Sequence, residues 1–168
     1  MRFGYQSIIY GPRFESASEL DRALAFISDS GFSGVELFQE PDEFRRLGLN
    51  CQQLVEKLAR FGLSMLGMSG ADLKARREFL GDYKSPYLYT DIFPIEEVQK
   101  TLLAGYRVAL HPHAFKPIHN VEDALRWFRD PRFQKYWQGG TKQLLLLPDT
   151  AHSKIVWDRD DRCDSGIP

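Results

Sequence analysis

Short apolar runs alternate along this chain with longer stretches in which apolar residues recur every three or four positions. The runs predict strands and the longer stretches predict helices, because a buried strand is apolar throughout whereas a surface helix is apolar on one face. Six strands are expected, at residues 3–10, 32–38, 63–68, 86–91, 106–110 and 144–147. Their alternation with helices indicates right-handed βαβ units and a parallel sheet, which is an α/β fold.

The predicted helices begin at residues that commonly start helices, by capping or by fixing the first turn. These residues are Ser16 or Ser18, Asn50, Pro94 and Asn120. The segment 71–84 could form a further helix, and its charged residues Arg76, Arg77 and Glu78 are expected on a solvated face.

Polar side chains that can bind a metal follow two of the predicted strands directly. Asp149 and His152 come after the last strand, whose four leucines 144–147 indicate burial on both faces. His111 and His113 come directly after the fifth strand. Parallel α/β proteins keep their chemistry at the C-terminal ends of their strands, so a metal site is expected there.

Only one of the two histidines after the fifth strand is expected to be a metal ligand. Residues that alternate along a strand face opposite sides, so at most one of His111 and His113 should contact a metal, unless Pro112 bends the chain. His119 lies just before a helix start and is interpreted as a solvent-facing loop residue.

Composition limits the classes of protein that the chain can belong to. Its 168 residues are 43% hydrophobic and 27% charged, which is typical of one soluble globular domain and not of a disordered or membrane protein. Lys and Arg number 22 against 23 Asp and Glu, so no basic field for nucleic acid is expected. The two cysteines lack CxxC spacing, which favours a reducing compartment, and a cytoplasmic location is expected.

The predicted strands are too few to close a barrel. A (β/α)₈ barrel takes about 250 residues and eight strands, whereas this chain has 168 residues. We therefore expect an incomplete barrel of about six parallel strands with helices outside, over residues 1–152, and an irregular tail over residues 153–168.

Three motifs resemble those of the xylose isomerase-like TIM-barrel superfamily, the sugar phosphate isomerase/epimerase family. They are Gly31–Glu36, Val108–His113 and Asp149–His152. The resemblance implies a divalent metal at the C-terminal mouth of the barrel, with Asp149 as a ligand and His152 as a ligand or substrate contact. His111 stands where the family usually has a glutamate, and it is the third implied ligand. Because an imidazole replaces a carboxylate, the preference of the site shifts from Mg²⁺ or Mn²⁺ toward Zn²⁺, Fe²⁺ or Co²⁺. The identity of the metal is not decided by the sequence, and Mn, Co, Zn and Mg stay open.

The reaction that the resemblance implies is isomerisation or epimerisation of a sugar or polyol-type substrate through an enediolate. His111 or His113 could serve as the base. Glu36 stands where family members often place a site carboxylate, and its alternative interpretation is a buried residue hydrogen-bonded to backbone. The family's histidine on strand seven and glutamate on strand eight have no counterpart here.

Two other functions stay open. The chain could be a non-catalytic truncated fragment or half-barrel whose open edge needs a partner chain or a second copy. It could also be a metal-dependent phosphodiesterase similar to endonuclease IV, although the neutral charge and the few histidines weaken this alternative. A small-molecule sugar substrate and a homo-oligomer are the expected partners, and nucleic acid and membrane are not.

Overall fold

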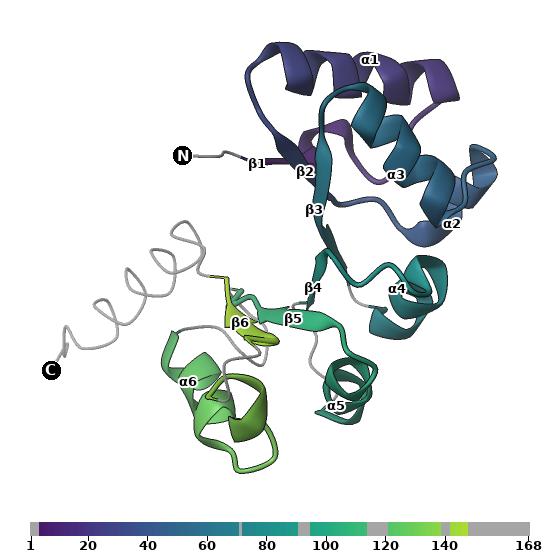
Figure 1. Cartoon of the computed structure of the whole chain (residues 1–168). Helices are drawn as coiled ribbons and strands as arrows, with labels where there is room; N and C mark the ends of the chain where they lie inside the picture. Colours follow the sequence, from purple (N-terminus) through teal and green to yellow (C-terminus); the bar gives the residue numbers. More distant parts are fainter. Residues whose placement is uncertain (1–3, 71, 91–94, 114–120, 139–141, 148–168) are drawn as a thin grey trace, which may run out of the picture. The chain divides into compact units, whose positions relative to one another are not determined.

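The fold is taken from a computed structural model, which describes residues 4–70, 72–90, 95–113, 121–138 and 142–147. The chain divides into two compact units, Met1–Tyr89 and Thr90–Pro168. Six parallel strands alternate with helices along the described residues, as Figure 1 shows, and this confirms the α/β class. No helix among these residues has the length and apolar character needed to cross a membrane.

The first unit is a parallel sheet of four strands with helical segments between them. The strands are β1 (Gly4–Gln6), β2 (Gly34–Leu37), β3 (Ser64–Ser69) and β4 (Tyr87–Thr90), paired in that order. The helical segments are η1 (Ser7–Tyr10), α1 (Ala17–Asp29), α2 (Pro41–Arg46), α3 (Cys51–Arg60) and α4 (Leu73–Leu80).

The second unit has the same alternation. Its strands β5 (Arg107–Leu110) and β6 (Leu144–Leu146) pair in parallel, and its helical segments are α5 (Ile95–Leu103), α6 (Val121–Arg129) and η2 (Gln134–Tyr136). The leucine strand is less enclosed than predicted, because Leu144 is buried whereas Leu145 and Leu146 are only half-buried.

Two helices of the first unit begin where the capping residues predict. The side chain of Ser16 accepts a hydrogen bond from the backbone of Glu19 at 3.2 Å, so Ser16, and not Ser18, caps α1. Asn50 and Gln53 form a reciprocal capping box at the start of α3, with both hydrogen bonds at 2.9 Å. These caps satisfy backbone N–H groups that the helices cannot satisfy internally.

The core of the first unit lies on one face of its sheet. Strand residues on that face are fully buried, and they include Val35, Leu37, Met65, Met68 and Leu88. They bury their side chains together with the apolar stripes of α1 and α3, which include Leu20, Leu24, Ile27, Leu54 and Leu58. The opposite face is therefore the one on which polar strand residues can gather.

The first predicted strand is shorter than residues 3–10. The chain leaves the sheet after Gln6 and forms η1, because Ser7 is buried and bonded to the segment after β2. Its hydroxyl donates to Gln39 Oε1 at 2.7 Å and accepts from the backbone N–H of Phe38 at 2.9 Å. These long-range bonds replace the strand pairing that the apolar pattern predicts.

Candidate functional site

The first candidate site lies on the sheet face opposite the core, near the C-terminal ends of β1 to β4. Strand pairing places Gln6, Glu36, Gly67 and Tyr87 in one row across the four strands. Side chains in such a row point to the same face of a sheet. The row therefore brings a carboxylate, an amide and a phenol together from strands far apart in the sequence.

Gly67 allows the Tyr87 ring to reach Glu36 across β3. A Cβ atom at Gly67 would lie 2.5 Å from Tyr87 Cε2, so the aromatic ring occupies the space that a side chain would take. The ring thus crosses β3, and the Tyr87 hydroxyl donates a hydrogen bond to Glu36 Oε2 at 2.5 Å. Any larger residue at position 67 would push the phenol away from the carboxylate.

A bulge in β3 puts Gly67 into this row. Val35 pairs with Met65 but Glu36 pairs with Gly67, so β3 contains one extra residue, Leu66. Leu66 lies over Gly34, where a Cβ atom would come within 2.7 Å of Leu66 Cγ. Leu66 therefore fills the layer of the open face just below the polar row.

Glu36 is held through both of its carboxylate oxygens. Gln6 Nε2 donates to Glu36 Oε1 at 2.5 Å and to the Tyr89 hydroxyl at 2.6 Å, while Tyr87 donates to Oε2. The residue is only 7% exposed. A carboxylate that leaves water needs such donors. Its partners are side chains of the neighbouring strands, whereas the alternative interpretation of the sequence expected backbone. Its catalytic role stays a prediction.

The second candidate site lies at the end of β5. The strand ends at Leu110, and the rings of His111 and His113 then lie edge to face, with centroids 5.8 Å apart. The two rings therefore do not face opposite sides, which is the case that the sequence left open for a chain that departs from strand geometry around Pro112.

The end of β6 lies beside this histidine pair. The backbone N–H of Leu147 donates to Leu110 O at 2.9 Å, and His111 Nδ1 lies 3.3 Å from Leu147 O. His111 is 9% exposed. A proton on Nδ1 would make this contact a hydrogen bond and leave the lone pair on Nε2. Asp149 and His152 lie outside the described residues, as does His119, and within the described part no three side chains form a metal-binding cluster.

Two solved structures resemble the whole arrangement. "Structure of L-ribulose 3-epimerase" matches with a TM-score of 0.64 and 18% identity, over 92% of this chain and 62% of that chain. The probable 3-DHS dehydratase AsbF, involved in petrobactin synthesis in Bacillus anthracis, matches with a TM-score of 0.60 and 15% identity, over 95% of this chain and 66% of that chain.

The fold is that of the TIM barrels. At these identities the likeness concerns the fold alone. This chain spans less than two thirds of the length of either structure. No family model and no curated protein matches the sequence.

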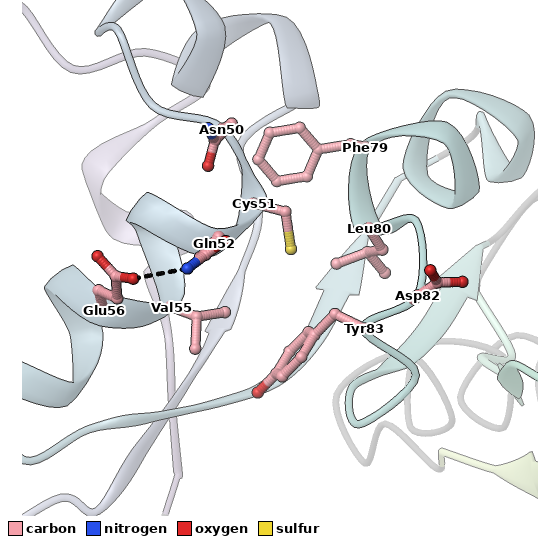
Figure 2. A pocket seen from close by; sticks show the side chains of 9 residues that line it. All are labelled: Asn50, Cys51, Gln52, Val55, Glu56, Phe79, Leu80, Asp82 and Tyr83. Carbon is pink, nitrogen blue, oxygen red and sulfur yellow. Dashed lines mark hydrogen bonds between the residues drawn. The ribbon is translucent and has the colours of Figure 1, made fainter.

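A hollow of about 450 Å³ lies between the start of α3 and the end of α4, and Figure 2 shows its side chains. Cys51, Phe79 and Tyr83 are among the residues that line it. Burial raises the pKa of the Cys51 thiol, which therefore stays protonated and weakly nucleophilic at neutral pH. None of the site residues predicted from the sequence lines this hollow.

A buried arginine fixes the segments that follow β2 and β3. Arg76 was expected on a solvated face, and this is wrong because its side chain is fully buried. One terminal nitrogen donates to Ser69 O and lies 2.9 Å from Glu40 Oε1, and the other donates to Asp72 O at 3.0 Å. The guanidinium thus ties the end of β3 to the segment after β2 and to the start of α4.

Helix α2, which the sequence pattern did not reveal, is fixed by a buried carboxylate. Glu43 accepts a hydrogen bond from the backbone N–H of Phe14 at 2.8 Å and from Arg46 Nε at 2.9 Å. Hydrogen bonding from Arg46 lowers the pKa of Glu43, against the opposing effect of burial. Pro41 in the first turn was the available signal for this helix.

Replacing Arg76 by Ala should lower the free energy of unfolding by about 2–4 kcal/mol, because a cavity forms and two carbonyls lose their donor. Arg76→Met should cost less, because it keeps the volume and because the Glu40 side chain is 53% exposed and can rehydrate. Urea unfolding followed by circular dichroism measures both. The control is Lys74→Ala on the exposed face of α4, and equal stability of Arg76→Ala and this control would contradict the assigned role.

Replacing Glu43 by Gln should remove a pH-dependent part of the stability. A lowered pKa in the folded state means that the stabilisation is present above the ordinary glutamate pKa and is lost as pH falls through the lower folded-state value. The variant should be less stable than the wild type by about 1–3 kcal/mol at neutral pH, and the difference should shrink in acid.

Denaturant unfolding across a pH series tests this expectation. Asp42→Asn is the matched control, because Asp42 lies in the same helix and its ion pair with Arg45 is exposed. A difference between wild type and Glu43→Gln that stays constant down to strongly acid pH would show that the carboxylate charge is not what stabilises α2.

Proposed function

We propose that this protein acts on a sugar or related polyol as a divalent-metal-dependent isomerase or epimerase. The observation that carries the proposal is the pair of adjacent histidine rings at the end of β5, beside the end of β6. The fold shared with a solved L-ribulose 3-epimerase supports the choice of reaction class. The metal, its identity, the substrate and the cytoplasmic location remain parts of the proposal.

His111 fits the role of a metal ligand. Histidines that bind metals usually donate the hydrogen of their other ring nitrogen to a carboxylate or a backbone carbonyl. The 3.3 Å contact between His111 Nδ1 and Leu147 O has this form, and it leaves Nε2 as the ring nitrogen that can bind a metal. The proposed ligand set is His111 with Asp149 and His152.

The chemistry then divides between the metal and the protein. A divalent cation would polarise a carbonyl and its neighbouring hydroxyl, so that the adjacent C–H group loses its proton more readily. His113 is proposed as the base that takes this proton, because its ring contacts that of His111 and a neutral imidazole can accept a proton.

A non-catalytic half-barrel completed by a partner or by a second copy is the second candidate. The chain covers 62% and 66% of the two structural neighbours, and whatever chain completes the barrel would supply the remaining strands. A partner could supply the second base that deprotonation and reprotonation on opposite faces of a sugar would need.

The metal proposal is tested by titrating Co²⁺ into the wild type, His111→Ala and Asp149→Ala and following the visible absorption of the bound ion. Each substitution should weaken binding by at least about tenfold, because each removes one ligand. His119→Ala is the matched control and should bind like the wild type. Equal binding by all four proteins would remove the metal site from this protein.

Catalysis is tested separately in D₂O with a panel of ketopentoses and ketohexoses. Proton exchange at the carbon beside the carbonyl, followed by NMR, is expected with Co²⁺ or Mn²⁺ in the wild type and not in His113→Ala. Metal binding without exchange on any sugar would favour the non-catalytic half-barrel.

A further inference from the structure

We infer that Gln6, Glu36 and Tyr87 form a polyol-binding subsite on the open face of the first unit, which binds vicinal hydroxyl groups. The inference rests on the proposed function for the choice of a polyol as ligand. Its geometry is independent of the histidine pair, because every group that it uses belongs to Met1–Tyr89.

The balance of donors and acceptors in the cluster indicates what kind of ligand it can bind. Both amide hydrogens of Gln6 are used, one on Glu36 Oε1 and one on the Tyr89 hydroxyl, and the Tyr87 hydroxyl hydrogen is used on Glu36 Oε2. A carboxylate has about four acceptor positions, and these bonds occupy only one on each oxygen. Within the described residues, no group donates to Gln6 Oε1.

This surplus of acceptors separates a binding site from a purely structural network. Buried polar groups of a structural network usually find their partners within the protein or in ordered water. Here Gln6 and Glu36 can still accept several hydrogen bonds, so the complementary ligand is one that presents several donors close together. Neighbouring hydroxyl groups of a sugar or polyol have this property.

The cluster is also accessible from one side. Gln6 is exposed and Tyr87 is half-buried, whereas Glu36 lies beneath them with 7% exposure. The Tyr87 ring covers Gly67 and so presents an aromatic surface next to the acceptors. An aromatic face carries negative charge density, which attracts the slightly positive C–H groups of a polyol. Ring and acceptors together thus match both kinds of group on a polyol.

Gly67 is explained by this arrangement. A glycine inside a strand weakens the strand, and it is expected where another group must approach the backbone closely. The group that approaches here is the Tyr87 ring, with three of its atoms within 2.9 Å of the position that a Cβ atom would take.

The test is binding of xylitol to the whole chain in metal-free buffer containing EDTA, followed by NMR of the Gln6 side-chain amide. The wild type should show a saturable shift of this signal at millimolar xylitol. Glu36→Gln and Gly67→Ala should weaken the affinity by about tenfold or more, because each removes or displaces a hydrogen bond that involves a charged group.

Gly67→Ala keeps all the functional groups and alters only the position of the Tyr87 ring, so it tests the geometry itself. Tyr87→Phe provides a second variant if the added methyl group prevents folding, and it should also weaken binding because the carboxylate loses one of its two supports. The matched control is Tyr83→Phe, which lies in the hollow between α3 and α4 and should bind like the wild type.

The absence of a saturable shift in the wild type, or equal affinity of all variants, would overturn the subsite. Xylitol has no carbonyl group and its binding needs no metal. A failed xylitol experiment beside intact Co²⁺ binding and proton exchange would therefore remove the subsite alone, and the converse result would remove the proposed reaction alone.

Discussion

The hydrogen bonding of the Glu36 carboxylate is the constraint on which the first unit depends. A carboxylate on a mostly buried sheet position must be hydrogen-bonded, or folding carries a cost of several kcal/mol. The donors come from β1 and β4, and they reach Glu36 only if four strands pair in one register and the residue between them on β3 has no side chain. One polar group therefore fixes strand order, register and the position of a glycine together.

The two units carry different kinds of chemistry. The polar row of the first unit combines an amide, a carboxylate and phenols, which bind and orient hydroxyl groups. The end of β5 in the second unit carries imidazoles, which bind metals and move protons near neutral pH. The two kinds of side chain thus belong to different units of the chain.

Local signals predicted the elements well, and non-local contacts account for the differences. Caps such as Ser16 and Asn50 act within one turn, so the starts of α1 and α3 could be predicted from neighbouring residues. The shortening of β1 depends on Ser7 meeting Gln39, a contact between residues distant in sequence. The burial of Arg76 likewise depends on Glu40 and on the carbonyl of Ser69.

The residues of the candidate sites divide in the same way, into those that short local motifs indicate and those that only long-range contacts reveal. The resemblance to a known family indicated His111 and Glu36 as candidate site residues, because each stands in a short motif near a strand end. The partners of Glu36 could not be found in this way, since Gln6 and Tyr87 lie 30 and 51 residues away. The alternation of Tyr87 and Tyr89 along β4 was visible, but only the register across β3 reveals that both hydroxyls reach the same carboxylate network.

The bulge at Leu66 lets β3 contain one residue more than β2 while both ends of the strand keep their faces. Along a regular strand Gly67 would turn toward the helices and Met68 toward the open face, because side chains alternate. The extra residue puts Leu66 and Gly67 on the same face and returns Met68 to the core, where it is fully buried. Deletion of this one leucine would therefore leave Met65, Gly67 and Met68 alternating on their present faces as a regular strand, and it would remove the side chain that lies over Gly34.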